Sequence, residues 1–258
     1  MKKGFLIDMD GVIYSGDDLI PGSDIFIKEL QKRKIPFLFM TNNSQRSPID
    51  TVNKVKKMGI SIKESNVYTS AMATSYFLSF MKPKGTAYVL GEGGLISSLH
   101  AVGYELINDK PDYVVLGEGR NFTLEMVNNA VEMILSGSKF IATNLDPSPR
   151  KRGWNNLGIK SIVSMIEEAT GVKAFSVGKP SPVMMRAARK KLGLTAQETI
   201  VIRDTLSTDI LGGIQLGYNT VLTLSGVSKV EDLEISAFVP SMIVDSCSKI
   251  NLDEVLKR

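Results

Sequence analysis

The stretch "FLIDMDGVIY", residues 5–14, decides how the fold of this chain is interpreted. It begins with an apolar run typical of a buried strand, and the run ends in Asp8 and Asp10, which a single residue separates. Two carboxylates about 4 Å apart repel each other by roughly 4 kcal/mol at the effective dielectric constant near a protein surface. The pair therefore requires a compensating interaction, and the rest of the sequence must supply it.

Further short apolar runs follow, separated by segments with helical spacing; they begin at Pro36, Asn66, Thr86, Asp112, Lys139, Thr199, Asn219 and Ser241. Apolar strands joined by helices predict a parallel sheet with helices on both faces, and so an α/β protein. One expected helix lies in "GSDIFIKELQKRK", with Ser23 or Asp24 as its N-cap. Another lies in "PSPVMMRAARKKLG", with Pro182 in its first turn and Gly193 at its end.

The bulk composition narrows the class of protein. The chain has 258 residues, 43% of them apolar, and a net charge of +4. Its Lys and Arg residues are scattered, apart from "RKRG" at 150–153, which disfavours a nucleic-acid partner and permits anionic small molecules. The single cysteine, Cys247, allows no intrachain disulfide, and no apolar run has the length of a signal or membrane segment. We expect a cytoplasmic protein without a membrane partner.

His100 is the only histidine, which excludes zinc sites with several histidines. A Ser-His-Asp or Cys-His arrangement would depend on this one residue, which lies in "SSLHAVG" and is expected to serve packing or the surface. Catalysis would therefore depend on carboxylates and lysine.

Polar groups follow three further predicted strands. "TNNS", residues 41–44, offers hydroxyl and amide groups to phosphate oxygens just before a predicted helix. Lys179 in "SVGKPSP" also precedes a helix and supplies a positive charge. Asp204 and Asp209 follow the strand in "TIVIRDTLSTDILGG". Ligands bind at the carboxyl ends of parallel strands, and gathered carboxylates suit Mg²⁺, which would offset the repulsion between Asp8 and Asp10.

In this order, Asp-x-Asp-Gly-Val, Thr-Asn-Asn, Gly-Lys-Pro and Asp-x4-Asp resemble the motifs of the haloacid dehalogenase superfamily of phosphatases. The insertion between the second and third motifs, which includes "ATNLD" and "IEEATG", is similar to that of the NagD-like, class IIA branch. The resemblance implies a Rossmann-like parallel-sheet core, residues 1–78 and 176–258, with an inserted α/β cap of the C2 type, residues 79–175.

The resemblance also implies roles for individual residues. Asp8 is the expected nucleophile, which forms an aspartyl phosphate, and Asp10 the acid that protonates the leaving oxygen and then activates water. Lys179 would balance the charge on Asp8 and the phosphoryl group. The substrate-binding residues would be Thr41, Asn42 and Asn43.

Mg²⁺ is the expected cofactor, with Asp8, Asp10 and Asp204 as its ligands and Asp209 in a supporting role. The fourth motif departs from the family, which has glycine where this chain has Arg203. An arginine beside a metal ligand is expected to reduce the affinity for Mg²⁺ while activity is retained.

The cap departs from the family as well, since Leu145 replaces the usual proline of Thr-Asn-Pro-Asp. The segment "DPSPRKRGWNN" is more readily a solvated loop than a contact for an anionic or planar leaving group, for which it offers Arg150, Lys151, Arg152 and Trp154.

The sequence thus predicts a Mg²⁺-dependent phosphatase of small phosphomonoesters: sugar phosphates, nucleoside monophosphates, phosphoglycolate or aryl phosphates. Two alternatives stay open. Arg203 supports a noncatalytic phosphometabolite-binding or regulatory protein, and two near copies of a glycine turn, "YVLGEGG" at Tyr88 and "VVLGEGR" at Val114, are the basis for a nicotinamide-cofactor oxidoreductase, although neither completes GxGxxG. The resemblance also permits a homodimer formed through the cap.

Overall fold

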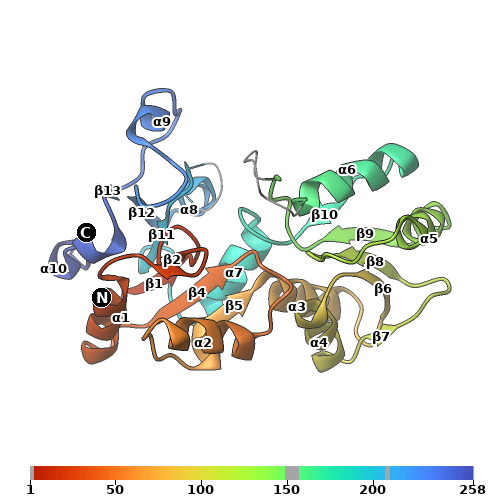
Figure 1. The fold of residues 1–258 in the computed structure, drawn as a ribbon, viewed down its shortest axis with the longest axis horizontal. Coiled ribbons are helices and arrows are strands. Elements are labelled where there is room, and N and C mark those ends of the chain that lie inside the picture. Colours follow the sequence, from red (N-terminus) through yellow and green to blue (C-terminus); the bar gives the residue numbers. More distant parts are fainter. Residues whose placement is uncertain (1–2, 149–156, 207–209, 258) are drawn as a thin grey trace. The chain divides into compact units, whose positions relative to one another are not determined.

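The computed structural model describes residues 3–148, 157–206 and 210–257. These form two compact units, the first with Met1–Thr41, Asp50–Tyr68 and Met185–Arg258, the second with Asn42–Ile49 and Thr69–Met184. Figure 1 follows the chain through both.

The first unit is built on a six-stranded sheet in the order β13-β12-β11-β1-β4-β5. Its strands are β1 (Gly4–Ile7), β4 (Phe37–Thr41), β5 (Val67–Thr69), β11 (Thr199–Arg203), β12 (Asn219–Thr223) and β13 (Met242–Val244). β1 is central and pairs in parallel with both β11 and β4. All four of its residues are buried, as expected for a strand that is covered on both faces.

The following helices and short connections lie wholly or mainly in this unit: α1 (Ser23–Lys32), α2 (Pro48–Lys57), α7 (Pro182–Lys191), α8 (Leu211–Gln215), α9 (Val230–Glu234), α10 (Leu252–Val255), the 3₁₀ turns η1 (Glu64–Asn66) and η3 (Cys247–Lys249), and the hairpin β2 (Tyr14–Ser15) with β3 (Asp18–Leu19). Apolar residues of α1, α2, η3 and α10 pack on one face of the sheet. Their burial supplies the main driving force for this layer.

The second unit has a parallel five-stranded sheet in the order β10-β9-β8-β6-β7. The strands are β6 (Thr86–Leu90), β7 (Glu105–Leu106), β8 (Tyr113–Leu116), β9 (Lys139–Ala142) and β10 (Phe175–Ser176), and the helices are α3 (Ser70–Met81), α4 (Gly93–Ala101), α5 (Leu124–Leu135) and α6 (Ile159–Thr170). α5 and α6 bury their apolar faces on β6, β8 and β9. The predicted α/β class with parallel sheets is confirmed.

The predictions for individual strands and for the start of α7 are confirmed, whereas the predicted N-cap of α1 is wrong. Every apolar run that we expected to be a strand is one, and Pro182 opens α7. The N-cap prediction for α1 was wrong, because Gly22 occupies that position with φ 81°. The Ser23 hydroxyl is fully buried and donates to the carbonyl of Ile13 at 2.9 Å, so it holds the loop after β1 instead of the helix end.

Within the described residues, no helix has the length and apolar character needed to cross a membrane.

Candidate active site

Asp8 and Asp204 follow adjacent strands of the first unit. β1 and β11 are in register with Ile7 opposite Ile202, so the chain carries both aspartates past the same end of the sheet. Both carboxylates are largely buried, with side chains 8% and 4% exposed. Burying two carboxylates so close together is unfavourable unless partners compensate the charge.

Arg203 is one such partner. Its Nη1 lies 3.0 Å from Oδ2 of Asp8, and its Nε lies 3.5 Å from Oδ1 of Asp204. The guanidinium therefore bridges the two carboxylates from the last residue of β11. Its side chain is 11% exposed, so water screens this charge weakly.

Two glycines leave room for the Asp204 carboxylate. A Cβ on Gly11 would lie 2.2 Å from Oδ2 of Asp204, and a Cβ on Gly226 would lie 2.0 Å from the same atom. Gly11 also has φ 78°, which favours glycine independently. The carboxylate accepts hydrogen bonds from the backbone N–H of Val227 at 2.8 Å and the hydroxyl of Thr205 at 3.0 Å. Only residues without side chains could pack so closely around it.

Asp10 lies on the exposed side of the same loop. Partial removal from water raises the pKa of Asp10, the negative charge of Asp8 raises it further, and Lys54 opposes both effects. Burial and the negative charge of Asp8 also raise the pKa of Asp204, and the positive charge of Arg203 opposes this rise. An acid with a raised pKa holds its proton longer, which suits a proton donor.

Asp8, Asp10 and Asp204, all among the described residues, offer the donor atoms that a magnesium site requires, but not the grouping of three such residues. Carboxylate oxygens are the hard ligands that Mg²⁺ prefers. Among the side chains that the structure describes, no three His, Cys, Asp or Glu residues are grouped as a metal would need. The donor types fit Mg²⁺, and the Arg203 guanidinium is the cation that competes for two of them.

A second set of polar residues lies within the second unit. The Asn42 side chain accepts a hydrogen bond from the Lys179 backbone N–H at 2.8 Å and donates to the Lys179 carbonyl at 3.1 Å and to Oδ1 of Asp146 at 2.9 Å. A Cβ on Gly178 would lie 2.8 Å from Oδ1 of Asn42 and 2.3 Å from the carbonyl of Thr143, which explains the glycine before Lys179. Lys179 itself is 1% exposed.

Glu118 joins the same network. Its Oε2 accepts a hydrogen bond from the Ser44 backbone N–H at 2.7 Å, and its own N–H donates to Oγ of Ser44 at 2.8 Å. Burial raises the pKa of Glu118 to about 7, to which the negative charge of Asp146 contributes. Glu118 is not among the residues predicted from the sequence, where it is only part of a glycine turn, because its partner Ser44 lies 74 residues away.

Two family models match this chain: haloacid dehalogenase-like hydrolase over residues 5–105 and HAD-hydrolase-like over residues 176–250. The ribonucleotide monophosphatase NagD of Escherichia coli K12 is 37% identical over 250 residues, which cover 97% of this chain and 98% of that protein. The chain belongs to the haloacid dehalogenase-like hydrolases.

Other members of this hydrolase family agree. The dihydroxyacetone phosphatase of Corynebacterium glutamicum is 37% identical and the match covers 95% of this chain and 90% of the relative. The crystal structure of a double mutant of thermostable NPPase from Geobacillus stearothermophilus has a TM-score of 0.91 and 34% identity, covering 97% of this chain and 99% of that one. The structure of Escherichia coli NagD also has a TM-score of 0.91, with 37% identity, and covers 96% and 98% of the two chains. This hydrolase is a phosphatase of the NagD-like, class IIA branch, as the motifs predicted.

The structure divides the predicted site residues of this hydrolase between its units. Asp8, Asp10, Thr41 and Asp204 belong to the first, whereas Asn42, Asn43 and Lys179 belong to the second. Asp8 and Asp204 are joined through Arg203, and Asn42 contacts Lys179 directly. Asn43 accepts a hydrogen bond from the Arg46 backbone N–H at 3.0 Å through its Oδ1. Asp209, Arg150, Lys151, Arg152 and Trp154 lie outside the described residues.

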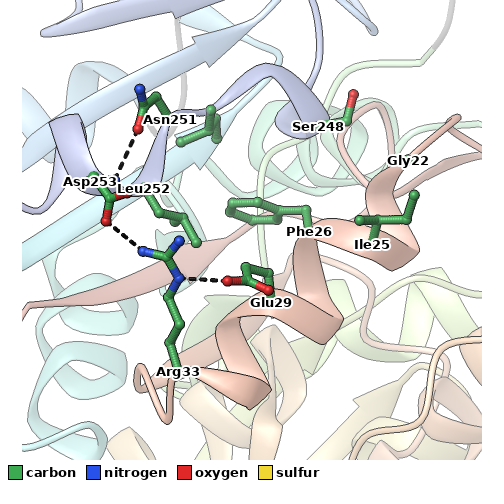
Figure 2. Close-up of a pocket in the computed structure, with 10 residues that line it drawn as sticks. Gly22, Ile25, Phe26, Glu29, Arg33, Ser248, Asn251, Leu252 and Asp253 are labelled. Atoms are coloured by element: carbon green, nitrogen blue, oxygen red, sulfur yellow. Dashed lines mark hydrogen bonds and ion pairs between the residues drawn. The ribbon is translucent and has the colours of Figure 1, made fainter.

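Figure 2 shows a pocket of the hydrolase between α1 and the segment that leads into α10. Arg33 extends across it and binds Glu29 and Asp253, each at 2.6 Å. None of the described site residues predicted from the sequence lines this pocket. Its one guanidinium is already neutralised by two carboxylates, so it offers little to an anionic ligand.

Proposed function

We propose that this chain is a Mg²⁺-dependent phosphatase that hydrolyses small phosphomonoesters through an aspartyl phosphate on Asp8. The observation that carries the proposal is the buried Asp8 carboxylate at the end of β1, beside a cation and a second buried aspartate. Relatives named for dihydroxyacetone phosphatase, ribonucleotide monophosphatase and acid sugar phosphatase activity favour small phosphorylated metabolites as substrates.

The proposed reaction has two displacements at phosphorus. In the first, an Asp8 oxygen attacks, the bond from phosphorus to the leaving oxygen breaks, and Asp10 donates its proton to that oxygen. In the second, Asp10 takes a proton from water, whose oxygen attacks the same phosphorus and frees Asp8 and inorganic phosphate. The raised pKa of Asp10 supports its proposed role as the proton donor in the first displacement.

The phosphoryl oxygens would be bound by Thr41, Asn42 and Asn43, with Lys179 as a balancing charge. Both amide hydrogens of the Asn42 side chain are donated to protein acceptors. We therefore assign the contribution of Asn42 to its backbone N–H, while its side chain fixes the loop. Backbone amides also bind phosphate in other anion sites, such as those at helix N-termini.

Asp8, Asp10 and Asp204 would hold Mg²⁺, with Asp209 supporting it. When bound, this ion would neutralise negative charge on the phosphoryl group. Because Arg203 already pairs with Asp8 and Asp204, we expect the affinity of the site for Mg²⁺ to be lower than that of a site without this arginine. A weakened, phosphometabolite-binding protein stays the alternative, and Arg203 is the observation that favours it.

We keep residues 79–175 as the proposed cap, with residues 1–78 and 176–258 as the proposed core. The second sheet, β6 to β10, supports a cap of the α/β type. Participation of this cap in a homodimer is part of the same proposal.

The deciding experiment measures phosphate release from a panel of phosphomonoesters during a Mg²⁺ titration. Asp8→Asn, which is close in size to the wild-type residue, should lose at least roughly a thousandfold in kcat. Circular dichroism would verify that this variant folds. If the wild type binds phosphate but shows no turnover at any Mg²⁺ concentration, the phosphatase proposal is wrong and the alternative, a phosphometabolite-binding protein, is favoured.

A further inference from the structure

Glu118 and Ser44 form a reciprocal pair within the second unit. The backbone N–H of each residue is bound by the side chain of the other, at 2.7 Å and 2.8 Å. The Ser44 hydroxyl also lies 3.4 Å from the Glu118 carboxylate and is fully buried. The loop after β8 is thereby attached to the segment that follows β4.

Neighbouring residues reinforce this attachment. The Thr143 hydroxyl donates to Oγ of Ser44 at 3.3 Å, and the Asn144 amide donates to the carbonyl of Asn42 at 2.9 Å. A Cβ on Gly117 would lie 3.0 Å from Oγ of Ser44, so glycine permits the close approach. The backbone of residues 42–44 is therefore held from two loops of the second sheet.

Keeping a carboxylate at this position costs stability. The pKa of Glu118 is raised to about 7, chiefly by burial, with Asp146 contributing repulsion. An apolar side chain of similar size would avoid this cost. Glu118 is therefore better explained by what its carboxylate holds in place than by a contribution to folding.

We propose that Glu118 is a positioning residue that acts through Ser44 to hold residues 42–44 in the conformation that binds the phosphoryl group. This inference rests on the proposed function, in which Asn42 and Asn43 bind the phosphoryl oxygens. Glu118 itself need not touch the substrate. Its effect should therefore appear in phosphate affinity more than in the chemical step.

Three variants test the role of the carboxylate. Glu118→Leu fills the space without an acceptor, Glu118→Gln retains an acceptor for the Ser44 N–H without the charge, and Glu118→Asp retains the charge with a shorter reach. Glu92→Leu is the matched control, since Glu92 occupies the same position in the other glycine turn and binds the backbone N–H of Arg120 at 2.8 Å. KM, kcat and the dissociation constant of inorganic phosphate, by calorimetry, are measured for each.

Glu118→Leu should raise KM and the dissociation constant of phosphate together by about tenfold, with kcat changed less than about threefold. Glu118→Gln should restore both to within about threefold of wild type, whereas Glu92→Leu should leave both unchanged. If the leucine variant does not fold, Glu118→Asp takes its place, and we expect it to raise both KM and the dissociation constant of phosphate.

Unchanged constants in the leucine or aspartate variant would overturn the inference, as would a glutamine variant as impaired as leucine. Turnover that is independent of Asp8 would overturn the proposed function instead, because phosphate binding is measured separately from catalysis. A wild type that neither turns over nor binds phosphate would overturn both.

Discussion

In the first unit, the groups that follow β1 and β11 are held mainly by charge, whereas in the second unit those that follow β4 are held by hydrogen bonds. Arg203 bridges two buried carboxylates at 3.0 Å and 3.5 Å. Around Asn42 and Ser44, the contacts are hydrogen bonds that join backbone groups to amide, hydroxyl and carboxylate side chains. An ion pair can exchange one cation for another, but a set of directional hydrogen bonds fixes geometry. The first region is thus suited to a change of ligand and the second to constancy of shape.

The largest effect should come from crowding the charged region. Gly11→Ala would place a Cβ 2.2 Å from Oδ2 of Asp204 at φ 78°, and should lower the free energy of unfolding by about 3 kcal/mol. Gly16→Ala is the control: its φ is 63° and nothing lies within 4 Å of its Cβ, so about 1 kcal/mol is expected. Urea unfolding measures both. Equal losses would show that Asp204 yields to the methyl group.

The next prediction concerns the hydrogen-bonded region. The pKa of Glu118 is about 7 in the folded protein against an ordinary 4.5, so the folded state binds its proton more tightly than the unfolded state. Protonated Glu118 therefore stabilises the folded state relative to ionised Glu118. This stabilisation is complete below about pH 4.5 and is lost as the pH rises through about 7. Relative to Glu118→Gln, the wild type should therefore lose at most about 3 kcal/mol of unfolding free energy between about pH 4.5 and about pH 8. A constant difference across this range would contradict the prediction.

Exchange of the cation is tested by Arg203→Gly. Without the guanidinium, Asp8 and Asp204 lose a competing positive charge, so the dissociation constant of Mg²⁺ should fall by roughly tenfold. Calorimetry measures it directly, and the Mg²⁺ concentration for half-maximal activity should fall with it. Arg203→Lys, which keeps the charge, serves as the control and should bind Mg²⁺ about as weakly as the wild type. An unchanged or higher requirement in the glycine variant would contradict the competition.

The smallest effect should come from an exposed ion pair. Arg33 binds Glu29 and Asp253 at the surface pocket of Figure 2, with a side chain 38% exposed. Because water and salt screen such pairs, Arg33→Ala should change Tm by no more than about 2 °C. A large shift in calorimetric Tm would mean that burial alone does not separate Arg203 from Arg33.

The sequence predicted those features that depend on nearby residues. Apolar runs specified the strands, and the motifs after them placed Asp8, Thr41, Lys179 and Asp204 at strand ends. The hairpin of β2 and β3 was missed because two-residue strands leave no periodic pattern. The Glu118–Ser44 pair and the contact of Arg203 with Asp8 depend on which strands are neighbours, and strand order is not encoded in any local pattern. The N-cap of α1 failed because Ser23 found a tertiary acceptor.

The pairing of β1 with β11 has a consequence for synthesis of the chain. Gly4 pairs with Thr199, so β1 leaves the ribosome long before its neighbour exists. At roughly 5–20 residues per second, β1 waits on the order of ten seconds or more for that partner. During this interval an apolar strand has an unpaired edge, which is the kind of surface that chaperones protect. Asn42 likewise waits for Lys179, 137 residues later. The predicted phosphate-binding segment is thus among the earliest parts of the chain to be made and among the last to be completed.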